Sequence, residues 1–277
     1  MDLNALFPIG KSSLLSCSLC SLQFLSPLPD RESLNKIYED YYSVWGIDQL
    51  DKEISAMKKK TFSSYLNYLK LPAERGAFLD VGCATGEMLA LAREMGFDVY
   101  GVEVSPRGVS LCRKLFGEHK IKGKNIEYDD FPAGFFDVIT LSDVLEHLTD
   151  PPEFIAMLSK MLKSNGLMLI VTPDTSSFTC RLLGKYWPHY KIEHLHYFNR
   201  FNLLKMCSSH FKLLTVTTPY KTLTLNYISN IINGYHRNML ARAIVQFIQW
   251  LPQRWRANHF KINTGEMLML FKKIECS

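Results

Sequence analysis

The residues best suited to chemistry lie where an apolar run ends in a turn that contains two glycines. The run 78–81 is apolar apart from Asp80, Gly82 and Gly86 follow it, and a helical pattern begins at Glu87. Glycine lacks a Cβ and readily adopts positive φ, so its backbone lets a ligand approach closely. The stretch therefore predicts a strand, a tight turn and a helix N-terminus that together form a ligand site.

The turn differs from the dinucleotide-binding fingerprint G-x-G-x-x-G, whose third glycine would fall at Glu87. A carboxylate at a helix N-terminus disfavours a pyrophosphate there, because both groups are negative. A ligand without phosphates fits better, and its cationic end would lie near Asp80 and Glu87. S-adenosylmethionine, with its sulfonium and α-amino groups, meets this description.

A second acid, Glu103, follows the next predicted strand, 21 residues after Gly82. A carboxylate at this place can accept hydrogen bonds from both hydroxyls of a ribose. The same acid occurs in dinucleotide sites, and the alternative is a surface acid at a strand end. Together with the glycine turn at this spacing, Glu103 favours a ribose-binding role.

Alternating strand and helix patterns from 77 to 173 must position these residues. Near-continuous apolar strands are typical of a parallel sheet covered on both faces, and such sheets bind ligands at the carboxyl ends of their strands. The candidates Asp80, Gly82, Glu103, Ser142 and Asp143 all fall at such ends. The predicted strands are 77–81, 98–104, 121–127, 136–141 and 167–172, and the predicted helices are 87–95, 107–116 and 152–162, the last ending at Asn165-Gly166.

Six motifs in one order make the stretch 77–173 similar to a known family. They are Asp80-Val-Gly-Cys-Ala-Thr-Gly86, Gly101-Val-Glu-Val-Ser105, Phe136-Asp-Val-Ile139, Asp143-Val-Leu-Glu-His-Leu148, Asp150-Pro151 and Leu162-Lys-Ser-Asn-Gly166. As a set they resemble class I S-adenosylmethionine-dependent methyltransferases. The resemblance implies an α/β, Rossmann-like fold with a mostly parallel seven-stranded sheet and an antiparallel C-terminal strand, here with N-terminal helices and a helical insertion.

The resemblance also implies roles for individual residues around S-adenosyl-L-methionine. The turn would line the methionine portion, Glu103 would hold the ribose, and Val104 would pack on the adenine. Asn125 stands where this fold often has an acid beside the adenine. The cofactor-binding set is Asp80, Gly82, Cys83, Ala84, Gly86, Glu103, Val104, Asn125, Ile126, Ser142, Asp143 and Leu145.

The flanks resemble bacterial methyltransferases that begin with a small cysteine ribbon. Cys17-x-x-Cys20 is half of a zinc site, but no second pair lies near it, so the ribbon is degenerate and an isolated turn is favoured over zinc. Residues 1–30 are predicted to be irregular, and residues 31–71 to be helical, with a stripe of Tyr38, Tyr41, Tyr42 and Trp45 that packs on the core or covers the cofactor. Members of this group often act in cell-surface polysaccharide or secondary-metabolite assembly.

Histidines are the candidates for catalysis. A hydroxyl acceptor must lose a proton as it attacks the methyl carbon, and imidazole has a suitable pKa. We predict His147 and His196 as catalytic residues, although His147 could instead be structural, and only one of His194 and His196 can face the pocket because they alternate. A third possibility is a divalent metal ion. Its ligands would be Asp143, Glu146, His147 and His196, a pattern that resembles some metal-dependent methyltransferases. A metal-free site is the working prediction.

The basic charge is concentrated in a C-terminal attachment. From Tyr220 onward there are eight Lys and Arg against two acids, whereas the first 219 residues hold 24 against 25. Between the predicted strands 211–217 and 266–271, residues 221–262 repeat apolar side chains at helical spacing. We predict a helical cap over the acceptor cleft, and peripheral membrane contact through 221–262 is the alternative. A nucleic-acid substrate is disfavoured because the core has no basic surplus.

Composition indicates the class of protein and its compartment. Of the 277 residues, 47% are apolar and 21% charged, which is ordinary for a globular protein. Seven scattered cysteines fit reduced thiols, and neither a leader peptide nor a membrane-spanning run is visible. We therefore expect a cytoplasmic protein, with peripheral membrane contact as the alternative. The predicted units are 1–71 (cysteine segment and helical cap), 72–219 (cofactor-binding domain), 220–262 (insertion) and 263–277 (last strand).

The sequence thus predicts methyl transfer to a hydroxyl of a small-molecule, glycan or lipid-linked acceptor. An amine acceptor is one alternative. The others are an inactive protein that still binds S-adenosylmethionine and, third, a nicotinamide-dependent oxidoreductase. The sequence does not indicate an oligomeric state.

Overall fold

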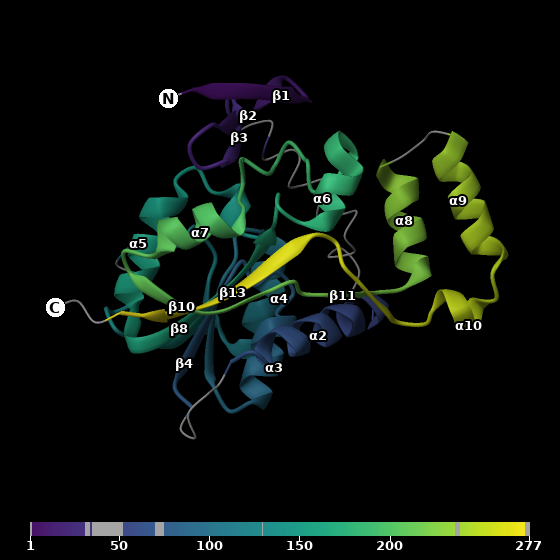
Figure 1. The fold of residues 1–277 in the computed structure, drawn as a ribbon. Coiled ribbons are helices and arrows are strands. Elements are labelled where there is room, and N and C mark those ends of the chain that lie inside the picture. Colours follow the sequence, from purple (N-terminus) through teal and green to yellow (C-terminus); the bar gives the residue numbers. More distant parts are fainter. Residues whose placement is uncertain are drawn as a thin grey trace.

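The computed structural model describes residues 2–30, 34, 52–69, 75–128, 130–235 and 239–274. A seven-stranded sheet forms its centre, in the order β10-β13-β8-β7-β4-β5-β6 (Figure 1). Only β13 runs antiparallel to its neighbours, so the predicted fold class is confirmed. The strands are β4 (Ala77–Val81), β5 (Asp98–Val102), β6 (Ile121–Lys122), β7 (Phe136–Ser142), β8 (Leu162–Pro173), β10 (Phe211–Thr217) and β13 (Glu266–Lys273).

Helices cover both faces of this sheet, which explains its near-continuous apolar strands. On one face α2 (Lys52–Leu66), α3 (Glu87–Glu94) and α4 (Pro106–Phe116) share a buried cluster with Phe78 and Val138. On the other face α5 (Pro151–Met161) and α7 (Arg200–Cys207) pack on Leu79 and Ile139. Neighbouring residues of β4 and β7 thus enter opposite layers, as the alternation of side chains along a strand requires.

Several boundaries differ from the prediction. β5 ends at Val102 rather than at 104, and β6 ends at Lys122 rather than near 127. Helix α5 ends at Met161 rather than near Asn165-Gly166, and β8 begins at once with Leu162. Leu162 pairs with Phe136 of β7, and a register irregularity follows before Val138 pairs with Leu167. The turn-forming Asn-Gly pair therefore lies inside an irregular strand, where Asn165 takes a left-handed φ of 64°.

The N-terminal segment is ordered as a sheet, so its prediction as irregular was wrong. Strands β1 (Leu3–Ile9), β2 (Ser12–Cys17) and β3 (Gln23–Ser26) are antiparallel, and β3 continues the sheet to β9 (His196–Tyr197). Leu14 and Leu25 are buried against Trp187 and Tyr197 of a distant segment. This small sheet is stabilised by tertiary packing, which local composition does not reveal. The aromatic stripe at 38–45 lies outside the described residues.

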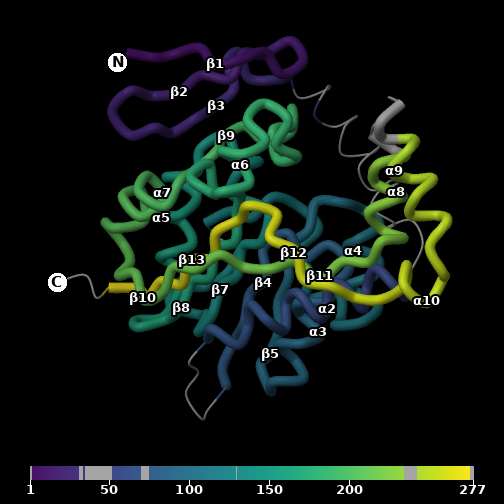
Figure 2. Tube along the Cα trace, turned by 45° about the vertical axis from the view of Figure 1, so that its right-hand side comes forward, coloured from purple at the N-terminus to yellow at the C-terminus, as the bar shows by residue number. Residues whose placement is uncertain are grey.

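Residues 221–262, which we name the arm, extend from one side of the sheet (Figures 1 and 2). At its base β11 (Lys221–Leu223) pairs antiparallel with β12 (Phe260–Ile262). Between them lie α8 (Leu225–Tyr235), α9 (Met239–Trp250) and α10 (Gln253–Arg256), as the helical spacing predicted. Short elements elsewhere are α6 (Phe178–Leu183), η1 (Glu118–Lys120), η2 (Leu145–His147) and η3 (Gly184–Tyr186). Within the described ranges, no helix has both the length and the apolar character to cross a membrane.

Substitution of Leu25 tests whether the N-terminal sheet is part of the cooperative fold. Leu25 is 1% exposed, whereas Leu6 on the outer strand is 44% exposed. We expect Leu25→Ala to lower the free energy of unfolding by about 2–5 kcal/mol, because a cavity opens in a packed cluster. Leu6→Ala is the matched control and should change it little. Equal urea midpoints for the two variants would show that this sheet contributes nothing to the stability of the core.

Candidate active site

The glycine turn is fixed to the neighbouring strand through its backbone. The amides of Gly82 and Cys83 both donate to the carbonyl of Val102, over 2.8 and 3.0 Å. Gly82, Ala84 and Gly86 have φ values of 76°, 46° and 84°, the left-handed region that favours glycine. A Cβ at Gly82 would lie 2.6 Å from Val144, so the turn also passes close to the loop after β7. The sequence folds here as predicted because only these residue types tolerate both conditions.

Asp80 lies under this turn in a buried position. Its Oδ1 accepts a hydrogen bond from the Thr140 hydroxyl at 2.7 Å, across the β4–β7 pair. Burial raises the pKa of the Asp80 carboxyl to about 7, and the nearby charges of Glu103 and Glu87 raise it too, while Thr140 opposes the shift. A cationic group near Asp80 would favour the ionised form, so the position suits a positively charged ligand.

Glu103 is buried, which excludes the alternative of a surface acid. One of its oxygens accepts from the amide of Ala84 at 2.7 Å, and the other from the amides of Val104 and Ser105 at 2.9 and 2.8 Å. The carboxylate therefore connects the glycine turn to the end of β5. Beside it, Val104 exposes 53% of its surface, as expected of an apolar platform for a ring.

Other predicted cofactor residues differ in what they present. Cys83 is buried with its sulfur 3.9 Å from that of Cys112, in the helix layer, so its backbone rather than its thiol faces the turn. Ile126 and Leu145 are buried in the core cluster, and Asn125 is exposed on the loop after β6. Ser142, at the end of β7, has a buried hydroxyl without a hydrogen-bond partner among the described residues. This orphaned donor, the cation-friendly Asp80 and the exposed Val104 together fit S-adenosylmethionine.

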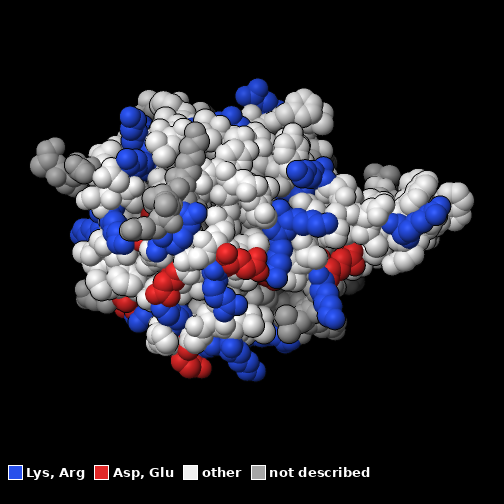
Figure 3. Space-filling model, turned by 90° about the horizontal axis from the view of Figure 1, so that it is seen from below, with Lys and Arg blue, Asp and Glu red and all other residues white. Residues whose placement is uncertain are grey.

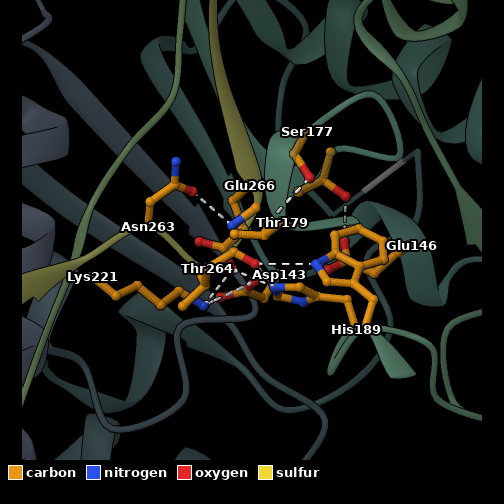
Figure 4. A network of polar contacts seen from close by, with 12 residues as sticks. Asp143, Glu146, Ser177, Thr179, His189, Lys221, Asn263, Thr264 and Glu266 are labelled. Carbon is orange, nitrogen blue, oxygen red and sulfur yellow. Dashed lines mark hydrogen bonds and ion pairs between the residues drawn. The ribbon is translucent and has the colours of Figure 1, made fainter. Parts of the chain in front are cut away.

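A polar network lies beside this turn, at the ends of β7 and β13 (Figure 4). Lys221, at the base of the arm, contacts Asp143 at 3.2 Å and Glu266 at 2.5 Å. The charge of Lys221 lowers the pKa of Asp143 although burial opposes this shift. Burial raises the pKa of Glu266 to about 7, and Lys221 limits the rise. The two acids in turn raise the pKa of Lys221, against the effect of its burial, so the ammonium stays charged.

Three further side chains meet next to this network. The ligand atoms offered by Glu146, His147 and His194 all lie within 4.8 Å of one another. Glu146 is fully buried; its Oε2 accepts from Thr172 at 2.9 Å, and its Oε1 lacks a hydrogen-bond partner within the described part of the chain. Burial raises the pKa of Glu146 to about 8, and the charge of Asp143 adds to the shift. The carboxyl is therefore mainly protonated at neutral pH.

His147 has a defined tautomer. Its Nδ1 lies 2.9 Å from the carbonyl oxygen of Glu193, and a carbonyl only accepts, so Nδ1 carries the hydrogen and Nε2 does not. Burial lowers the pKa of His147 to about 4, which keeps the ring neutral. Its ring stands perpendicular to that of His194, with centroids 4.7 Å apart. His147 thus has the protonation state that a general base needs.

The two predicted catalytic histidines are not brought together. His196 lies on β9, paired with Phe24, and its Nδ1 bonds the carbonyl of Leu148 at 3.0 Å. His194 is the alternating residue that lies beside His147, and its Nδ1 has no hydrogen-bond partner among the residues described. Of the four metal ligands weighed from the sequence, Glu146 and His147 belong to the compact group and Asp143 and His196 do not.

Sequence reasoning missed three residues of the network. Lys221 was counted only as one basic residue of the C-terminal segment, and Glu266 only as one of its two acids and as the start of a strand. His189, whose Nε2 donates to the carbonyl of Thr264 at 3.1 Å, was not singled out at all. Burial lowers its pKa to about 3, so this ring is neutral as well. An acid at the start of an otherwise apolar strand was the one signal that could have indicated Glu266.

Comparison with known proteins identifies the family. Residues 54–210, more than half of the chain, match the model of a methyltransferase domain. The chain belongs to this methyltransferase family. The match spans β4 to β8 with the turn, Glu103 and the Glu146–His147 loop, so the recognition of a class I S-adenosylmethionine-dependent methyltransferase from its motifs is confirmed. S-adenosylmethionine is the cofactor that this membership implies.

Individual relatives and solved structures are also similar to this chain. A ubiquinone biosynthesis O-methyltransferase of Cereibacter sphaeroides is 28% identical over 148 residues, which cover 51% of this methyltransferase and 58% of that protein. The chain therefore spans little more than half of that relative's length. A SAM-dependent methyltransferase from Archaeoglobus fulgidus matches with a TM-score of 0.51 at 19% identity, covering 79% of this chain and 94% of the other. The YcgJ protein of Bacillus subtilis gives 0.51 at 16% identity, covering 78% and 99%. These structures share the fold.

The buried carboxyl of Glu146 predicts a pH-dependent stability. Between about pH 5 and pH 8 the folded methyltransferase keeps a proton that the unfolded chain releases, because the folded pKa is raised above the ordinary 4.5 to about 8. Stability should therefore fall as pH rises through this window, by up to about 1.4 kcal/mol per pH unit.

Glu146→Gln removes this titration and keeps the shape of the side chain. Urea unfolding of both proteins across the window should show that the wild type loses stability relative to the variant as pH rises. Glu118→Gln, at an exposed carboxyl, controls for the loss of one charge. Parallel curves for wild type and Glu146→Gln would show that Glu146 does not hold its proton.

Proposed function

We propose that this methyltransferase transfers a methyl group from S-adenosylmethionine to a hydroxyl group of an acceptor that binds over the loop 143–147. The observation that carries the proposal is the neutral imidazole of His147, with its protonated Nδ1 fixed on a carbonyl and its Nε2 unprotonated. A hydroxyl must lose a proton when it is methylated, whereas a neutral amine can attack first. The printed name of the Cereibacter sphaeroides relative, an O-methyltransferase, supports the same acceptor group.

The bound cofactor supplies a methyl group on a positively charged sulfur. The chain holds it through the turn at Gly82–Gly86, with Asp80 near the cationic end and Glu103 at the ribose. Ser142, with its orphaned hydroxyl, would donate to the methionine portion. These groups are fixed before binding by the strand ends and by the amides that hold Glu103, so little ordering is needed on binding.

His147 would accept the acceptor's proton at Nε2. As the ring gains positive charge, the Glu193 carbonyl at Nδ1 stabilises it, and the ionised Asp143 nearby favours it as well. The low pKa of His147 makes the ring a weak base, but the loss of positive charge at sulfur during transfer favours a gain of positive charge at the ring. Alignment of the acceptor with the methyl group remains the larger part of catalysis.

Exposed apolar side chains on α6 and η3, next to the network around Glu266, support an acceptor with an apolar part. Gly265 lies so close to the start of α6 that a Cβ there would fall 2.8 Å from Ser177 Oγ, so α6 borders the network around Glu266. Phe178, Leu182 and Tyr186 on α6 and η3 expose most of their surfaces. Exposed apolar side chains that lie together are typical of surfaces that receive an apolar ligand or partner. The proposal is therefore a hydroxyl on an aromatic or amphiphilic molecule.

His147 variants test the proposal. We expect His147→Ala to lower turnover by about 10²–10⁴-fold, the usual contribution of a general base, and to leave the affinity for S-adenosylmethionine unchanged in calorimetry. His196→Ala is the matched control, since His196 lies outside the cluster, and should keep most of its turnover. Turnover would be followed as labelled methyl transfer to a panel of phenols, amphiphilic alcohols and amines.

The outcomes of this experiment separate the alternatives. Normal turnover of His147→Ala, or a loss confined to His196→Ala, would contradict the role of His147. Transfer only to amines would replace the hydroxyl acceptor. Binding of the cofactor without transfer to any member of the panel would favour an inactive binding protein, and binding of NAD instead would favour an oxidoreductase.

A second candidate is a metal-assisted transfer at the same cluster. The specific observation is that two buried atoms, Glu146 Oε1 and His194 Nδ1, have no hydrogen-bond partner among the described residues and face the same space as His147. One carboxylate and two imidazoles suit a divalent transition metal better than magnesium. In this case turnover should be lost after dialysis against a chelator and restored by the metal, and Glu146→Gln should abolish the restoration. Unchanged activity after chelation would eliminate this candidate.

A further inference from the structure

The arm carries charge of one sign only. Residues 221–262 contain six Lys and Arg and no Asp or Glu. The charge of Lys221 is balanced within the protein by its ion pairs with Asp143 and Glu266. Arg242 in the first turn of α9 and Arg254 on α10 are exposed, and Lys261 is exposed on β12 at the base of the arm. Such a surface attracts an anionic partner.

Helix α9 has two apolar faces, and only one of them is covered. Val245 and Ile248 are buried against α8. Phe247 and Trp250, three residues apart and therefore neighbours on the helix surface, are 62% and 82% exposed. On α10, Trp255 is 54% exposed. A second apolar face is unnecessary for packing of the arm on itself, so its aromatic side chains fit a contact outside the chain.

We propose that the outer surface of α9 and α10 binds an anionic lipid bilayer. Trp and Phe side chains favour the boundary between headgroups and hydrocarbon, and Arg and Lys beside them pair with anionic headgroups. Both kinds of group occur together here, on a helix pair that projects from the body. Figure 3 shows the arm standing out at the right of the body, with basic side chains near its end.

The charge of the arm argues against two other partners. A second copy that docked through this surface would bring like charges together, which opposes association. A nucleic acid is matched by several cations in a groove or stripe with aromatic side chains that stack on bases, whereas α9 and α10 together expose two arginines beside large apolar side chains. The lipid surface satisfies the aromatic and the basic groups at once.

Vesicle flotation tests this inference with the whole protein. The wild type should bind vesicles of phosphatidylcholine mixed with phosphatidylglycerol at low salt, and bind vesicles of phosphatidylcholine alone much more weakly. Arg242→Gln and Arg254→Gln should each weaken binding by about five-fold, since one cation near an anionic surface contributes about that factor. Phe247→Ser/Trp250→Ser should weaken it by about ten-fold or more, through the loss of apolar burial.

Matched controls keep the result specific. Phe201→Ser removes an exposed aromatic side chain of α7, away from the arm, and should bind as the wild type does. Circular dichroism and affinity for S-adenosylmethionine report whether each variant is folded, and neither depends on a known acceptor. Failure of the wild type to float with anionic vesicles would overturn the proposal, and so would full binding of Phe247→Ser/Trp250→Ser.

Two further outcomes would assign the surface to another partner. Concentration-dependent dimers that disappear in Trp250→Ser, in sedimentation velocity without lipid, would identify a second copy. Tighter binding to single-stranded DNA than to anionic vesicles, lost in the arginine variants, would identify a nucleic acid. Either result would overturn the lipid proposal.

Discussion

The ion pairs of Lys221 with Asp143 and Glu266 set the arrangement of the whole acceptor side. Glu266 is fully buried at the start of β13, and Asp143 follows β7, so without a cation two acids would face each other at the sheet end. Two close carboxylates cannot both stay ionised without a counter-charge. Lys221 supplies it from the first residue of the arm. The position of the arm and the ionisation of the loop 143–147 are therefore determined together.

Carboxyl groups in the two halves of the site are in different protonation states, and their partners explain why. Asp143 has an ammonium beside it and stays ionised. Asp80 and Glu146 each accept a hydrogen bond from a threonine hydroxyl and have no ammonium partner among the described residues, so burial dominates and raises their pKa values to about 7 and 8. With Glu146 neutral beside a neutral His147, the ionised Asp143 is a negative charge that favours protonation of the His147 ring. The loop 143–147 thus carries one ionised acid, Asp143, and one neutral acid, Glu146.

The sequence was informative where local pattern decides the structure. The strands between 77 and 173 and the glycine turn were predicted because buried parallel strands are apolar throughout and the turn demands residues that tolerate positive φ. The N-terminal sheet was missed because its serine-rich strands depend on Trp187 and Tyr197, far away in the chain. Alternation showed that one of His194 and His196 faces the site, but the pairing of β9 with β3 decides which. Lys221 was missed because 78 residues separate it from Asp143.

The ion pair of Lys221 with Asp143 connects the arm to the loop 143–147, so the arm is not a separate attachment. β11 and β12 pair at its base, and Lys221 on β11 forms an ion pair with Asp143 of the loop 143–147. A lipid surface that bound the arm would therefore also fix the orientation of the loop 143–147 relative to the lipid. The exposed apolar side chains of α6 lie next to the network around Glu266. An acceptor with an apolar part gathers at a lipid surface for the same reason that Phe247 and Trp250 do, because its burial there releases water from apolar area. Orientation by the arm and enrichment of the acceptor would then arise from one physical effect.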